Sequence, residues 1–179
     1  MRRIQIATAV AIAAIAVVAT PASAQRARAG SYVTYAAAAP SATRDSVAAA
    51  RAQQLSERAD KRWHSYDLSG ARRDLQSAVE ILRARQLYAG PTLVSLANVT
   101  YTVGDLDGAA KVLVEAAAEA AAFGDIVVQV QSTFEASLLF TQAGDRGQAS
   151  RLLDATRRLL QSPYLPQDVK ERIERRIIA

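Results

Sequence analysis

The residue types that support catalysis or metal binding are scarce in this chain. Its only histidine is His64, and it has no cysteine, so a cysteine nucleophile, a disulfide and a cysteine- or histidine-rich metal site are excluded within one chain. No serine lies in a G-x-S-x-G turn, and neither G-x-G-x-x-G nor G-x-x-x-x-G-K-[ST] occurs. We therefore expect a protein that is not an enzyme, with no catalytic residue, no metal site and no cofactor.

Two pairs of carboxylates have spacings that occur in functional sites. The segment Asp105–Gly108 (D-L-D-G) resembles the start of a calcium loop, but Ala116 stands where that loop needs a glutamate. Glu115 and Glu119 lie one helical turn apart, but carboxylates that hydrolyse sugars need an aromatic cleft, and aromatic residues make up only 6% of the chain. We expect the aspartates at a helix start and the glutamates on a solvated face.

The N-terminal segment is typical of a secretory signal. Two arginines precede an uncharged apolar run, residues 4–19, which is shorter than the roughly 20 residues that span a bilayer. The small residues Ala22 and Ala24 suit a signal peptidase, so we expect residues 1–24 to be a signal peptide cleaved after Ala24. An uncleaved anchor is the alternative. The expected location is periplasmic or secreted, with no stable membrane span after cleavage.

The charge of residues 41–179 is nearly balanced. The whole chain has 22 basic and 17 acidic residues, whereas residues 41–179 have 18 basic and 17 acidic ones, which argues against a nucleic-acid partner. Residues 86–145 hold one basic and seven acidic residues between two basic segments. This acidic centre could attract a cationic peptide or pair head-to-tail with a second copy, and an ordinary solvated surface also explains it.

Residues 41–179 have the pattern of an all-α domain, and residues 25–40, which lack a sustained period, that of a flexible linker. The pattern becomes helical from Ser41, where Ser41 and Thr43 offer hydroxyls that can cap a helix. We expect helical stretches at residues 47–66, 71–87, 93–103, 106–123, 126–143, 147–160 and 167–179. The residues expected to face the core are Val47, Leu55, Ala59 and Trp63 in the first helix, Leu75, Ala78, Val79 and Leu82 in the second, and Val169, Ile173, Ile177 and Ile178 in the last.

An internal repeat organises these helices. Three segments superpose on a shared alanine, at Ala71, Ala109 and Ala149, which are 38 and then 40 residues apart. Each alanine is followed by a leucine four residues later, which indicates two helices in close contact at the small residue. A Gly-Asp pair before the second and third alanines supplies a helix stop and a helix cap. The pattern predicts helical hairpins that bury their apolar faces against each other.

The Gly-Asp-x-x-x-Ala turn resembles that of the tetratricopeptide repeat (TPR) family, and the similarity covers roughly residues 44–160. Three positions depart from the family pattern: Tyr66 replaces the turn glycine, Arg58 replaces a leucine, and Ser137 stands at a small position. The period also exceeds the family's roughly 34 residues. The resemblance implies a TPR-like α-solenoid of about three stacked antiparallel hairpins, with a C-terminal helix that caps the stack, a frayed tail or a dimer contact being the alternatives.

The resemblance also implies a concave groove, lined by the first helix of each hairpin, that binds a peptide. Trp63 and Tyr101 would offer rigid apolar area there, although each could equally belong to the core. The basic residues with which some TPR proteins hold a peptide carboxylate are not matched. The groove residues expected on this basis are Trp63, His64, Asn98, Tyr101, Gln131, Phe134 and Gln142.

The expected function is therefore a non-catalytic, exported module of the cell envelope that binds a protein or peptide. The alternative is an all-α carrier of a small apolar ligand or lipid. The two differ in the binding site, because a peptide needs an open groove of mixed polarity and a carrier needs a closed apolar cavity of several hundred Å³.

Overall fold

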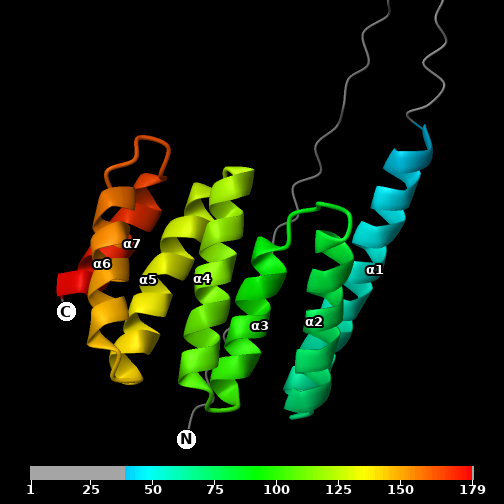
Figure 1. Cartoon of the computed structure of the whole chain (residues 1–179), viewed down its shortest axis with the longest axis horizontal. Coiled ribbons are helices and arrows are strands. Elements are labelled where there is room, and N and C mark those ends of the chain that lie inside the picture. The colour runs from blue at the N-terminus through cyan, green and yellow to red at the C-terminus, as the bar shows by residue number, and fades with distance from the viewer. Residues whose placement is uncertain (1–38, 179) are drawn as a thin grey trace, which may run out of the picture. The chain divides into compact units, whose positions relative to one another are not determined.

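The computed structural model describes residues 39–178 of the 179-residue chain. The predicted signal peptide and all but the last two residues of the predicted linker lie outside the described residues. Within them, the regular structure consists of seven α-helices without a strand, which confirms the all-α fold class (Figure 1). The helices are α1 (Ala39–His64), α2 (Leu68–Arg83), α3 (Gly90–Thr102), α4 (Leu106–Phe123), α5 (Ile126–Gln142), α6 (Arg146–Leu159) and α7 (Gln167–Ile178).

From α2 onward, the helix boundaries agree with the expected ones to within four residues, and those of α4 agree at both ends. The first helix differs more, because α1 begins at Ala39, eight residues before residue 47 and two before Ser41, so residues 41–43 lie inside the helix and not at its cap. Pro40 lies in its first turn, where the missing N–H has no helical partner and a proline is tolerated. The last two residues of the expected linker, Ala39 and Pro40, therefore belong to the helix. Alanine favours this outcome, since it has the highest helix propensity.

Aspartates begin four of the helices. The side chains of Asp67, Asp105, Asp125 and Asp145 each accept a hydrogen bond, of 2.8–3.0 Å, from the backbone N–H three residues later. Such a bond satisfies one of the N–H groups that the first helical turn leaves unpaired. The role expected for the aspartate at position 105 is thus confirmed.

Each helix from α1 to α6 packs against its neighbours in the chain: α1 on α2, α2 on α3, and so on to α6. Short connections join them, so consecutive helices run antiparallel (Figure 1). Two contacts leave this order, because α3 and α7 both also touch α5 directly. Both α3 and α7 are therefore neighbours of α5, although neither is next to it in the chain.

The predicted core residues of α2, Leu75, Ala78, Val79 and Leu82, are all buried. The repeat alanines Ala71 and Ala109 are completely buried and Ala149 nearly so, as two close-packed helices require.

Two expected core residues are instead exposed, Val47 at 63% and Ile178 at 85%. Val47 lies near the start of α1, which has 26 residues against 16 in α2, so its first turns extend beyond the end of their partner (Figure 1). Ile178 lies in the last turn of α7. The buried contacts of this helix come from Val169 and Ile173, which lie earlier in it.

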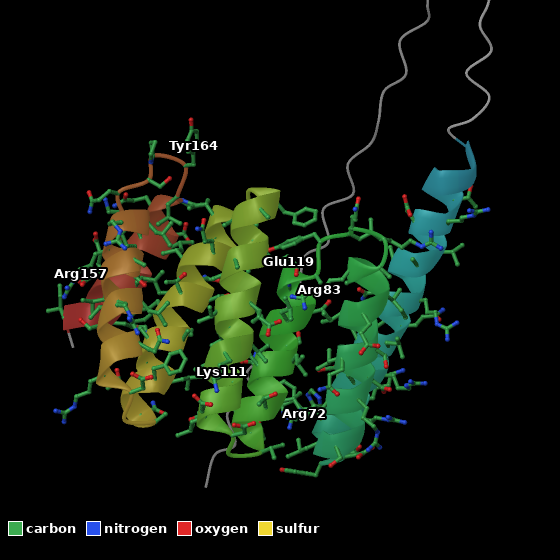
Figure 2. The ribbon with its side chains drawn as sticks, in the orientation of Figure 1. Arg72, Arg83, Lys111, Glu119, Arg157 and Tyr164 are labelled. Carbon is green, nitrogen blue, oxygen red and sulfur yellow. The ribbon has the colours of Figure 1, made fainter. Side chains whose placement is uncertain are left out.

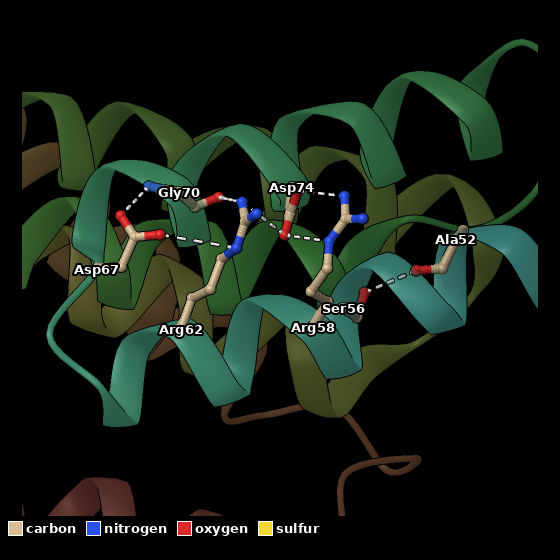
Figure 3. Close-up of polar contacts among 7 residues, drawn as sticks. All are labelled: Ala52, Ser56, Arg58, Arg62, Asp67, Gly70 and Asp74. Atoms are coloured by element: carbon tan, nitrogen blue, oxygen red, sulfur yellow. Dashed lines mark hydrogen bonds and ion pairs between the residues drawn. The ribbon is translucent and has the colours of Figure 1, made fainter.

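A polar network joins α1 to α2 where the repeat pattern has a leucine (Figure 3). Arg58 donates two hydrogen bonds, of 2.6 and 2.7 Å, to the carboxylate of Asp74, which is 5% exposed. Arg62 adds an ion pair to Asp74 at 3.1 Å and contacts Asp67 at 3.6 Å. The arginine therefore replaces the leucine without leaving a buried charge unpaired, because Asp74 accompanies it.

A second polar cluster holds the connection between α2 and α3 against α4. Glu119 accepts hydrogen bonds from the backbone N–H of Ala89 at 2.5 Å and from Arg83 at 3.1 Å, and Figure 2 shows Arg83 beside Glu119. The hydroxyl of Tyr88 donates to Asp125 at 3.0 Å. Burial, together with that hydrogen bond, raises the pKa of Tyr88 above its usual value, so this hydroxyl remains a donor.

Among the described residues, no helix combines the length and apolar character that crossing a membrane requires.

Candidate functional site: a groove between α3, α5 and α7

A groove of about 670 Å³ lies between α3, α5 and α7, with Leu113 of α4 at its base. Its volume is in the range of pockets that bind small molecules or peptide side chains. The three helices meet there because α3 and α7 both contact α5.

Five of the seven residues expected in a peptide groove line this one, and they come from α3 and α5. The polar residues Asn98 and Gln142 are exposed at its rim together with the half-exposed ring of Tyr101, and Gln131 lies partly buried between them. Phe134 is almost completely buried and forms part of the floor, rather than an exposed contact. The five residues that the groove brings together are Asn98, Tyr101, Gln131, Phe134 and Gln142.

The other two expected residues, Trp63 and His64, lie at the end of α1 and do not line the groove. The ring of Trp63 is half-buried against a core cluster that includes Ala71 and Leu75. His64 is exposed, and its Nδ1 lies 2.8 Å from the backbone oxygen of Asp60, one turn earlier in the same helix.

The floor of the groove is apolar. Leu113 of α4 and Ile173 of α7 are buried beside Phe134, and Leu138 and Leu139 of α5 are partly buried. Apolar side chains of a ligand would lose contact with water on this floor, which is worth about 25 cal/mol per Å² of buried surface. The groove thus combines an apolar base with a polar rim.

The last helix supplies two arginines that our sequence reasoning did not place in the site. The guanidinium of Arg176 lies 4.9 Å from the centre of the Phe134 ring and forms an ion pair with Glu135. The hydrogen bond to Glu135 raises the pKa of Arg176 further. Arg172 forms an ion pair with Asp168 at 3.0 Å. Their spacing of four residues puts both on one face of α7, but the sequence does not indicate which helix that face meets.

Ser132 is a second residue that the sequence did not single out. It lines the groove from α5 and is 2% exposed. Among the described residues, its Oγ is the one buried side-chain nitrogen or oxygen without a hydrogen-bond partner. An unpaired buried hydroxyl costs roughly 1–3 kcal/mol, and a ligand group that bonded to it would recover part of that cost.

The charged residues among the described lining of the groove are already paired within the chain. These residues are Glu135, Arg172 and Arg176. Over the helices that the structure describes, no group of three or more His, Asp or Glu side chains is arranged to hold a metal ion. Apolar burial, amide hydrogen bonds and guanidinium groups are therefore what the groove presents to a ligand.

All seven acids of the chain's acidic centre take part in contacts within the described residues. Asp105, Asp125 and Asp145 accept hydrogen bonds from backbone N–H groups at helix starts. The other four acids pair with basic side chains, which are Lys111 for Asp107, Arg83 for Glu115 and Glu119, and Arg176 for Glu135.

In comparisons with known proteins, no family model matches the chain and no curated protein matches it.

Proposed function

We propose that the described helices form a TPR-like α-solenoid. In this arrangement α1–α2, α3–α4 and α5–α6 are three stacked hairpins and α7 is the capping helix. The packing of each helix on its chain neighbours and the shared Asp caps support this proposal. The burial of Val169 and Ile173 of α7 supports the capping role.

The function that fits best is non-catalytic binding of a protein or peptide in the cell envelope, after export by the N-terminal signal. The observation that carries this proposal is the groove of about 670 Å³, in which five separately expected residues meet. Exposed amides at the rim can hydrogen-bond a peptide backbone, and the apolar floor can take its side chains. The bound segment carries at least one large apolar side chain, because the floor is apolar and Glu135, the acid among the described lining of the groove, is already paired with Arg176.

The carrier of a small apolar ligand remains the second candidate, and the apolar floor with Phe134, Leu138 and Ile173 favours it. The exposed rim residues Asn98 and Gln142 favour the peptide, because a lipid would leave their amides without partners.

A capture experiment with groove variants tests the proposal. The immobilised chain is exposed to an envelope extract, and bound proteins are identified by mass spectrometry. We expect one or a few specific partners on the wild-type chain and at least about tenfold less of them on the double variant Asn98→Ala/Tyr101→Ala. A tenfold loss corresponds to about 1.4 kcal/mol, a typical effect of truncating interface anchors.

His64→Ala is the matched control, since His64 is exposed and lies outside the groove. It should capture the same partners as the wild type. Equal capture by the groove variant would contradict the proposal. Native mass spectrometry of the purified chain separates the carrier, because a copurifying small molecule that Tyr101→Ala releases would favour that function instead.

A further inference from the structure

Among the described residues, the first turns of α1 extend past the end of α2. The two helices are joined by a short connection and have 26 and 16 residues, so the longer one continues beyond its partner. Figure 1 shows this part of α1 projecting past α2. Isolated helical segments of a few turns are marginal in water, so a partner that packed here would stabilise the segment.

A trough of about 380 Å³ lies where this projecting segment meets the end of α2. We call its lining the ledge, which consists of Thr43, Arg44, Val47, Ala48 and Arg51 of α1, Ile81 of α2, and Ala84 and Arg85 just after α2. Val47, Ala48, Ile81 and Ala84 form the apolar part of the ledge. Val47 is exposed, and the two alanines would allow another helix to approach closely.

Three arginines surround this apolar strip: Arg44, Arg51 and Arg85. All three are exposed, and none of their side chains forms a hydrogen bond or ion pair within the part of the chain that the structure describes. No carboxylate of the described residues lines the trough. The arginines of the α1–α2 network, by contrast, are held by Asp74. The ledge is therefore an apolar strip with uncompensated positive charge on its borders.

We propose that the ledge binds an acidic amphipathic helix of a partner protein. The apolar stripe of that helix would pack on Val47 and Ile81, and its carboxylates would pair with the three arginines. Guanidinium groups form two parallel hydrogen bonds with a carboxylate, which makes arginine well suited to such pairs. This surface is separate from the groove between α3, α5 and α7. The proposal for the ledge can therefore be tested independently of the proposed function.

The chain itself does not supply a suitable occupant. Residues 1–44 contain no aspartate or glutamate, so the segment before the ledge carries no complementary charge. Most acidic residues of the described helices are already engaged in caps, ion pairs or hydrogen bonds. The described acids outside such contacts are Asp45, Glu80 and Glu174, which come from three helices and make no acidic stripe on one of them. A different protein therefore fits the ledge better than a second copy.

A selection for helical peptides tests this proposal. A display library of 16-residue helix-forming peptides is selected on the full chain and counter-selected on the ledge variant Arg44→Gln/Arg51→Gln/Arg85→Gln. We expect the enriched peptides to share an apolar stripe at helical spacing and a surplus of Asp and Glu. By fluorescence anisotropy, the enriched peptide should bind the ledge variant at least about tenfold more weakly than the wild type, and more weakly at high salt.

The control variant Arg151→Gln/Arg158→Gln/Arg175→Gln removes three exposed arginines that also lack partners, from α6 and α7. It should bind the peptide as the wild type does, and circular dichroism should show both variants folded. The proposal is overturned if no enriched peptide depends on the ledge arginines, or if the enriched peptides lack an acidic surplus. Binding of phosphatidylglycerol vesicles or self-association that needs these arginines, without peptide binding, would also overturn it.

Discussion

At the scale of single residues, the turn of the first repeat segment differs from the other two in the residue that adopts a left-handed conformation. The second and third turns have a glycine with a positive φ angle, 93° at Gly104 and 87° at Gly144. In the first turn Tyr66 occupies the same place with φ of 63°, a left-handed conformation that costs a non-glycine residue roughly 1–2 kcal/mol. Its ring is 88% exposed, so packing returns little of that cost.

Tyr66→Gly should therefore stabilise the protein. We expect a gain of about 0.5–1 kcal/mol, because glycine avoids the strain but gains more freedom in the unfolded chain. Thermal unfolding should show a rise of a few degrees, whereas Tyr66→Phe should change little. A lower melting temperature in the glycine variant would show that the exposed ring contributes a contact that we have not recognised.

Asp74 gives a prediction on pH. Its hydrogen bonds with Arg58 hold the pKa of the carboxyl below its usual value of 3.8, although burial opposes this effect. A carboxyl with a lowered folded-state pKa stabilises the protein above its unfolded-state pKa, and that contribution is lost as the pH falls through the folded-state value. Asp74→Asn should cost about 1–2 kcal/mol at pH 7, since the guanidinium groups of the exposed Arg58 and the partly exposed Arg62 can turn to water.

Urea unfolding at several pH values measures this effect. The difference in unfolding free energy between the wild type and Asp74→Asn should be constant from pH 7 to about pH 5 and shrink below about pH 4. A difference that does not depend on pH would mean that the charge of Asp74 has no part in stability.

At the scale of elements, much of the helix pattern could be predicted, because turns are local. The Gly-Asp pairs marked the boundaries of α4 and the start of α5 without error, since an αL glycine and an Asp cap act within a few residues. The start of α1 could not be predicted in this way. An alanine-rich segment with a proline is compatible with a linker and with a helix, and this segment has no apolar period that would indicate which of the two it forms.

The helices pack closely at the alanine that the three repeat segments share. Ala109 is completely buried at the position that the three repeats share. Ala109→Leu should destabilise the protein by roughly 1–3 kcal/mol, because the extra methylenes force neighbouring helices apart. Ala118→Leu, at an exposed position of the same helix, should be nearly neutral. Denaturant unfolding of both variants measures the contrast, and equal stabilities would refute the close approach at Ala109.

The contact of Glu119 with the connection before α3 is also testable. Glu119→Ala should cost about 1–2 kcal/mol, because the N–H of Ala89, which is buried, loses its acceptor. Glu115 is exposed and contacts the same Arg83, so Glu115→Ala should lower the free energy of unfolding by less than about 0.5 kcal/mol. If the two variants lost equal stability, the backbone hydrogen bond would not be the important contact.

At the scale of the whole molecule, the candidate site depends on contacts between helices far apart in sequence. The sequence placed Asn98, Tyr101 and Gln142 on one surface because repeat positions recur at a fixed interval. It predicted a C-terminal helix that caps the stack, but not that this helix borders the groove, a position that follows from the burial of Ile173 and the Arg176–Glu135 pair.

The sequence also grouped Trp63 and His64 with the groove. The structure separates them, because α3 contacts α5 directly while the end of α1 packs on α2. Position within a repeat therefore predicted which face a residue occupies, but not which faces join into one groove.

The central claim is that the groove between α3, α5 and α7 is where a partner binds. Photo-crosslinking in intact cells tests it most directly, with a photoreactive phenylalanine derivative introduced at Tyr101 and, in a separate variant, at His64. We predict a discrete crosslinked protein from position 101 that is absent from position 64. Crosslinks to the same protein from both positions, or from position 64 alone, would contradict the claim.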